Sequence, residues 1–72
     1  MEFEATLNGE DHDFHVIYKL ATQIEDNGTE TKYVDWWRVT EVDGVKDRAA
    51  CFEADKGLSA EDVENRILEW EA

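Results

Sequence analysis

The sequence predicts an α+β fold in which four antiparallel strands form a meander and one C-terminal helix packs on one face of the sheet, in the order ββββα. Three observations favour this class. Most of the chain before residue 54 alternates apolar and polar side chains, the period of a half-buried strand. Asn-Gly and Asp-Gly pairs, typical of tight hairpins, separate these segments. The last segment changes to the period of an amphipathic helix.

The first strand is expected over residues 2–7, where apolar side chains occupy the odd positions. Residues 8–13 are polar and are interpreted as a loop. The second strand is expected over residues 14–24, which alternate in the same way. This interpretation places Leu7 opposite Phe14.

The third strand is expected over residues 31–42, which are rich in β-branched and aromatic side chains. Asn27–Gly28 precedes it and indicates a two-residue type I′ turn, because both central residues of that turn need a positive φ. Asp43–Gly44 repeats the signal and predicts a fourth strand over residues 45–53.

The helix is expected over residues 60–71. Ser59 is a good N-cap, and Asp62 stands three residues later, close to a capping box. Leu58 and Val63 have the spacing of a hydrophobic staple. The apolar positions recur with helical spacing: Ala60, Val63, Ile67, Leu68 and Trp70.

The turns predict the register, and the register assigns side chains to the two faces of the sheet. Tyr18 is placed opposite Trp37, Val16 opposite Val39, and Thr22 opposite Tyr33. One face then gathers the core: Phe3, Ala5, Leu7, Phe14, Val16, Tyr18, Leu20, Trp37, Val39, Ala50 and Phe52. Asp35 falls on this face between Leu20 and Phe52. A buried carboxylate needs a partner, so a position at the edge of the core, or a bond to Tyr33 or Lys32, is expected rather than a catalytic role.

The opposite face cannot also be covered by a single helix. It is predicted to carry Ile17, Lys19, Ala21, Val34, Trp36, Arg38, Thr40, Ala49 and Cys51. Trp36 has three interpretations. It lies under the stems of Lys19 and Arg38 on a solvated face, or it belongs to a partner surface, or a β-bulge turns it inward together with Trp37.

Composition narrows the classes of function. The chain has 72 residues and 8.4 kDa, so one domain over residues 1–72 is expected. It has 19 acidic and 7 basic residues, a formal charge of −12. Such a surface repels phosphate, which argues against direct binding to nucleic acid or an anionic membrane. No signal peptide or membrane span is seen, and the single cysteine favours the cytoplasm, including that of a host cell.

No enzymatic activity, cofactor or metal site is expected. Two carboxylates and two imidazoles stand close together in the chain: Asp11, His12, Asp13 and His15. Their spacing matches no defined metal motif. Cys51 has no histidine at a defined offset and is expected to behave as a small apolar residue. Ser59, the only serine, is explained by its role as N-cap.

The final segment carries acids at helical spacing: Glu61, Asp62, Glu64, Glu69 and Glu71. Carboxylates three or four residues apart on a helix lie about 5–6 Å from each other. This resembles the roughly 6–7 Å between phosphates along one nucleic acid strand. The acids either form a solvated surface or imitate nucleic acid towards a basic partner.

In size, charge and architecture, although not in any motif, the chain resembles the small acidic inhibitors encoded by bacteriophages and mobile elements. These include DNA mimics, anti-restriction proteins and anti-CRISPR proteins. The resemblance implies a non-enzymatic module that binds a basic or nucleic-acid-binding protein. The expected contact residues are Lys19, Ile17, Val34, Trp36, Arg38, Glu61, Glu64, Glu69 and Glu71. The alternative is a self-associating accessory protein, a homodimer formed around Trp36.

Overall fold

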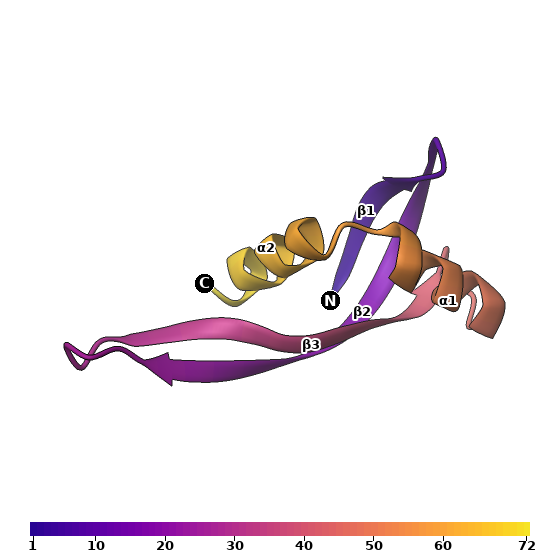
Figure 1. Ribbon diagram of the computed structural model, residues 1–72. Helices are drawn as coiled ribbons and strands as arrows, with labels where there is room; N and C mark the ends of the chain where they lie inside the picture. The colour runs from indigo at the N-terminus through magenta and orange to yellow at the C-terminus, as the bar shows by residue number, and fades with distance from the viewer.

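The computed structural model describes residues 1–72 and contains three strands and two helices (Figure 1). The elements are β1 (Glu2–Leu7), β2 (Glu10–Ile24), β3 (Glu30–Val42), α1 (Arg48–Gly57) and α2 (Ala60–Glu71). The strands form one antiparallel sheet in the order β1-β2-β3. The class is α+β, but the predicted arrangement of four strands and one helix is wrong.

The predicted fourth strand is the helix α1. Asp47 caps it, because its carboxylate accepts from the backbone N–H groups of Ala49 and Ala50. Alanine has the highest intrinsic helix propensity, so the Ala49–Ala50 pair that weakens a strand favours a helix here. Of the expected fourth strand only one bridge remains, between Val42 and Val45 across the Asp43–Gly44 turn.

The first hairpin is tighter than predicted. Asn8 and Gly9 have φ of 54° and 81°, the left-handed values that a type I′ turn requires. Residues 8–13 are therefore no loop, and Phe3, not Leu7, pairs with Phe14. The shift is an even number of residues, so Phe3 and Leu7 still face the core.

Two β-bulges interrupt the pairing of β3 with β2. Val16 pairs with Val39 and Tyr18 with Trp37, as predicted. The register shifts once on each side of this stretch, which leaves Asp35 and Thr40 on β3 without a partner. The bulges could not be deduced from alternation alone, because each changes the parity of the side chains beyond it.

Three predictions are wrong because of the bulge at Asp35. Val34 pairs with Leu20 and is 8% exposed, so it belongs to the core and not to the open face. Asp35 itself is exposed. The predicted pair of Thr22 with Tyr33 is also wrong, since Thr22 pairs with Lys32.

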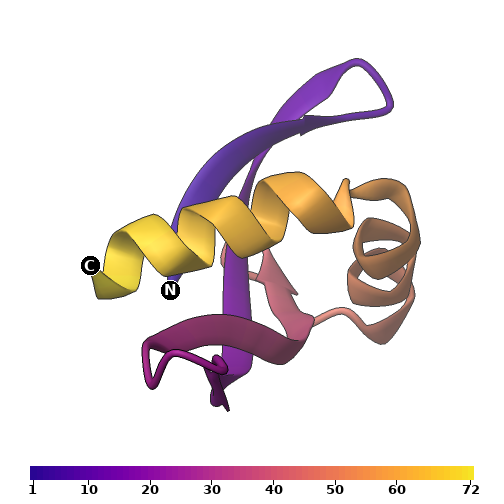
Figure 2. The same ribbon diagram turned by 60° about the vertical axis from the view of Figure 1, so that its left-hand side comes forward.

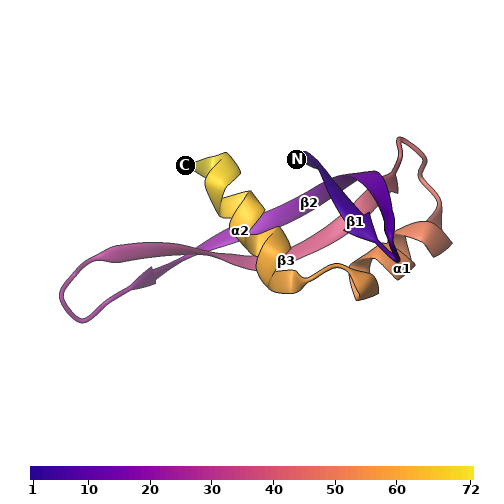
Figure 3. The same ribbon diagram turned by 90° about the horizontal axis from the view of Figure 1, so that it is seen from above.

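Both helices lie on the same face of the sheet (Figures 2 and 3). Each contributes apolar side chains to one core with β2 and β3. The buried residues are Phe14, Val16, Val34, Val39, Ala54, Val63 and Ile67. The Ser59 hydroxyl accepts from the N–H of Asp62, so α2 begins as predicted.

The residues predicted to join the core from the fourth strand and from the end of the helix do not all do so. Phe52 is 58% exposed because α1 is helical and turns its ring away from the sheet. Trp70, in the last turn of α2, is 65% exposed. Ala49 and Cys51 lie on α1 and therefore not on the open sheet face.

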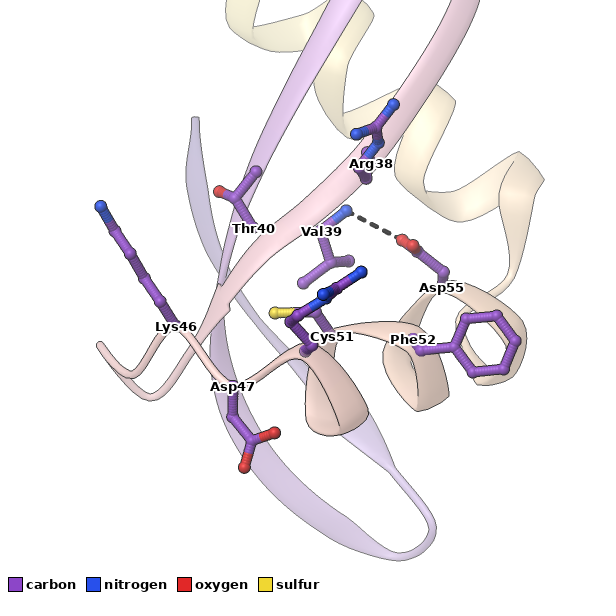
Figure 4. Close-up of a pocket in the computed structure, with 9 residues that line it drawn as sticks. Arg38, Val39, Thr40, Lys46, Asp47, Cys51, Phe52 and Asp55 are labelled. Atoms are coloured by element: carbon purple, nitrogen blue, oxygen red, sulfur yellow. Dashed lines mark hydrogen bonds between the residues drawn. The ribbon is translucent and has the colours of Figure 1, made fainter.

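Helix α1 is bonded to the edge of β3 beside the bulge at Thr40. The Asp55 carboxylate accepts a hydrogen bond of 2.8 Å from the backbone N–H of Val39 (Figure 4). The Thr40 hydroxyl donates to the carbonyl of His15 at 3.2 Å. These bonds satisfy polar groups at the point where the ladder is disturbed.

The far end of the β2–β3 hairpin projects beyond both helices (Figure 1). We call residues 21–33 the arm. Its connection spans five residues, with Glu25 N–H donating to Thr29 and Gly28 at φ 85°. The predicted two-residue turn at Asn27–Gly28 is therefore wrong. The arm makes the molecule elongated, with extents of 44 × 20 × 19 Å.

Candidate functional site

Most carboxylates of this chain have no basic partner. Among the seven Lys and Arg side chains, only Arg66 forms an ion pair, with Asp62 at 3.0 Å. The other ion pairs involve His12 and His15. The charge of −12 is thus presented to the surroundings rather than neutralised within the fold.

The predicted acids of α2 do not form one row. Glu61 and Glu69 are exposed, while Glu64 is half-buried. Glu71 accepts a hydrogen bond from the Tyr18 hydroxyl, which raises the pKa of Tyr18. The exposed acids on the outer side of α2 are therefore Glu61, Asp62 and Glu69.

A hollow of about 310 Å³ lies between α2 and the start of β1, and we call it the α2 hollow. It is lined by Met1, Glu2, Phe3, Arg66, Glu69 and Trp70. The Arg66 guanidinium lies over the Phe3 ring at 5.0 Å, so this surface already holds one cation against an aromatic ring. The unpaired carboxylate of Glu69 and the exposed Trp70 complete it, together with Glu2, whose carboxylate lies 3.4 Å from His15 Nδ1.

Sequence reasoning missed the α2 hollow because it placed Trp70 in the core stripe. One signal could have identified it. Trp70 stands between two acids, Glu69 and Glu71, in the last turn of the helix, where side chains can extend past the edge of the sheet into solvent. The contribution of the first three residues could not be foreseen, because it depends on the position of β1 beside α2.

The face of the sheet that carries no helix exposes Trp36, as predicted. Trp36 is 42% exposed, and the Arg38 guanidinium lies 5.9 Å from its ring centroid. Trp37 points to the core, so no bulge turns both rings inward. Ile17 and Lys19 lie across from Arg38 and Trp36 on β2.

The other end of the same open face is acidic. Glu4 lies directly opposite Asp13, and Glu2, His15 and Glu41 form the next row across the three strands. We call Glu2, Glu4, Asp13 and Glu41 the acidic end. Like charges directly opposite each other destabilise a sheet, so the pairing of Glu4 with Asp13 opposes folding.

The histidines and aspartates of residues 11–15 do not converge on a metal site. Asp11, Asp13 and His15 lie on the open face, whereas His12 lies on the other face beside Phe14. No group of three or more His, Cys, Asp or Glu side chains in the structure is placed to hold a metal ion.

His12 instead joins the first hairpin to the Asp43–Gly44 turn. Its Nδ1 lies 2.7 Å from Asp43 Oδ2, and the Asp13 N–H donates to Asp43 Oδ1 at 2.9 Å. The hydrogen bond to Asp43 raises the pKa of His12. The Asp43 pKa is lowered, by the Asp13 backbone N–H and then by His12.

Cys51 has no features of a nucleophile. Burial raises the pKa of its thiol, and the charges of Asp55, Asp47 and Glu41 raise it further. It lines a hollow of about 360 Å³ between α1 and β3, where no histidine is present to act as a base (Figure 4). The basic side chains at this hollow are Arg38, Lys46 and Arg48.

No protein-family model, curated protein or solved structure matches this chain. Neither helix is long and apolar enough to cross a membrane.

Proposed function

We propose that this chain is a non-enzymatic binding module that uses its acidic surface to occupy a basic surface of another protein, as a nucleic-acid mimic does. The contact that we assign is the α2 hollow with the outer acids of α2. The observation that carries the proposal is this hollow, in which the unpaired carboxylate of Glu69 and an exposed tryptophan lie beside the apolar side chains of Met1 and Phe3.

The α2 hollow has the chemistry that recognises a lysine or arginine side chain. The aliphatic stem of such a side chain packs against Met1 and Phe3, and its cationic head lies near Glu69 and over Trp70. Arg66 demonstrates the geometry within the chain, since its guanidinium lies over Phe3 and binds Asp62. Tryptophan is also enriched at the centres of protein interfaces.

The unpaired carboxylates supply attraction over a longer range. A surface of −12 steers a basic partner into contact, and the steering weakens as salt is added. Glu61 and Glu69 are exposed and unpaired and continue the acidic surface from the hollow along α2, whereas Asp62 is paired with Arg66. Basic grooves that bind phosphate are the natural complement, so the proposed partner is a protein that processes nucleic acid, and the chain is its inhibitor.

We place this encounter in the cytoplasm. The only cysteine is unpaired and half-buried, so the fold has no disulfide that would need an oxidising compartment.

The test compares two matched double variants. Glu69→Gln with Trp70→Ala removes one acid and one exposed aromatic ring from the hollow. Glu53→Gln with Phe52→Ala removes the same two kinds of group from the outer side of α1. Calorimetry with an oligo-arginine peptide should show binding that is roughly fivefold or more weaker for the hollow variant, the size expected for a lost cation–π contact. The control should bind like the wild type.

The nature of the partner is tested by affinity capture from a nuclease-treated bacterial lysate. Wild-type protein should retain basic nucleic-acid-binding proteins, and duplex DNA or RNA should compete with it for them. Equal losses in both double variants would show that only total charge matters and would contradict the assigned contact. Captured proteins that nucleic acid cannot displace would contradict mimicry.

A further inference from the structure

The chain exposes more surface than its mass requires. Its accessible surface is 5256 Å². A compact monomer of 8.4 kDa is expected to expose roughly 4,600 Å². The excess of roughly 600–700 Å² is close to the ~800 Å² that one partner contributes to an interface of standard size.

The β2–β3 hairpin extends along the longest dimension of the molecule, 44 Å, and no other element covers its open face (Figure 1). Ile17, Tyr33 and Trp36 expose about two-fifths of their surface on that face, at 41%, 43% and 42%. The outer edge of β3 is a poorer site, because the bulges at Asp35 and Thr40 discourage the addition of another strand. A partner is therefore expected on the face and not at the edge.

The open face has two halves of opposite charge. One half is the acidic end. The other half, which we call the basic–aromatic half, consists of Ile17, Lys19, Trp36 and Arg38. Neither Lys19 nor Arg38 forms an ion pair with a carboxylate of its own chain, although the chain has 19 acids. A purely basic partner would be repelled by this second half.

We infer that the open face binds a second copy of this chain in a two-fold dimer, in which the acidic end of each protomer lies on the basic–aromatic half of the other. A two-fold axis that lies in the plane of the face and crosses the strands at right angles reverses the strand direction. Each charged half then meets its complement, and both contacts are made twice. This inference does not depend on the proposed function, which uses the α2 hollow.

The same contact explains two otherwise unfavourable features. Glu4 opposite Asp13 costs stability in the monomer but gives Lys19 and Arg38 of a partner two carboxylates to bind. Trp36 and Ile17 become buried between the two sheets. Repulsion between two chains of −12 is screened beyond about 10 Å at 0.1 M salt, so the contacts within the interface determine its stability.

The test is a charge exchange between two chains. One chain carries Lys19→Glu with Arg38→Glu, and the other carries Glu4→Lys with Asp13→Lys. Each variant alone would place like charges together and should be monomeric, with a dimer dissociation constant at least roughly tenfold above that of the wild type. An equimolar mixture restores both complementary contacts and should return to dimer mass in sedimentation and light scattering, twice the 8.4 kDa of the chain.

Controls with the same change in charge are Lys32→Glu with Lys56→Glu, and Glu53→Lys with Glu61→Lys. These side chains lie outside the two charged halves, so both controls should dimerise like the wild type. Circular dichroism confirms that every variant is folded. A wild-type chain that remains monomeric up to millimolar concentration would overturn the inference. A mixture that stays monomeric, or controls that lose the dimer equally, would overturn it as well.

Discussion

The two ends of the β2–β3 hairpin are made of the same two strands but are held in different ways. At the packed end, Phe14, Val16 and Val39 are buried under the helices. In the arm, Ile24 is 71% exposed and only the ladder and the turn support the backbone. An isolated two-stranded ribbon is marginally stable in water, so the arm depends on the packed end for its order.

This difference shows that the residues that stabilise the fold and the surfaces that we assign to binding are separate parts of this small protein. Only seven side chains of the 72 residues are buried, and all belong to the sheet–helix core or its boundary. The surfaces that we assign to binding lie outside it, on the open face and beside α2. Substitutions should therefore separate the two properties.

The largest expected effect comes from the same substitution made in the two regions. Ile67→Ala removes a fully buried side chain of α2 and should lower the free energy of unfolding by about 2–5 kcal/mol. Ile24→Ala in the arm should change it by no more than about 0.5 kcal/mol. Urea denaturation followed by circular dichroism measures both. Similar decreases in the free energy of unfolding for the two variants would show that Ile24 packs as tightly as the core residues.

A smaller effect tests the bond that fastens α1 to the packed end. Asp55→Ala leaves the half-buried N–H of Val39 without an acceptor and should cost about 1–3 kcal/mol. Glu53→Ala changes an exposed acid of the same helix and serves as the control, with an expected change near zero. A neutral Asp55→Ala variant would mean that water replaces this bond at no cost.

The smallest effect concerns pH and the bond between His12 and Asp43. The pKa of His12 is raised above its ordinary 6.5, so its contribution is present below pH 6.5 and is lost as pH rises through the folded value. The pKa of Asp43 is lowered below 3.8, so its contribution is present above pH 3.8 and is lost as pH falls. These two groups favour maximal stability between about pH 4 and 6.5.

The measurement is the free energy of unfolding from pH 3 to 9. His12→Asn keeps a donor for Asp43 but cannot titrate, so the decline above pH 6.5 should become shallower. His15→Asn, on the opposite face, should keep the decline of the wild type. A decline above pH 6.5 that persists in His12→Asn but becomes shallower in His15→Asn would contradict this assignment.

Local patterns predicted the elements whose signals are complete within a few residues. Alternation defined β1, and Ser59 with the stripe of Val63 and Ile67 defined α2 at the bounds found. Residues 48–57 were assigned wrongly, because the Asp43–Gly44 turn before them is of a kind that often joins two strands of a hairpin. The Asp47 cap and the alanines favoured a helix, and they outweigh the hairpin signal in the structure.

The candidate surfaces were predicted only in part. Alternation along β2 and β3 placed Lys19, Trp36 and Arg38 on the open face, and the structure agrees. The acidic end was missed, because its rows depend on the register that the Asn8–Gly9 turn imposes on β1. The α2 hollow was missed for a similar reason, since the first residues meet α2 only in three dimensions.

The sequence by itself determined the charge, the alternation of β1 and β2, and the bounds of α2, because each arises from neighbouring residues. Only the tertiary structure decided that a bulge at Asp35 redirects Val34 into the core and that a second bulge leaves Thr40 without a partner. A bulge changes the face of every side chain beyond it, and its position is set by packing across the sheet. That packing also places acids and bases on separate halves of one face.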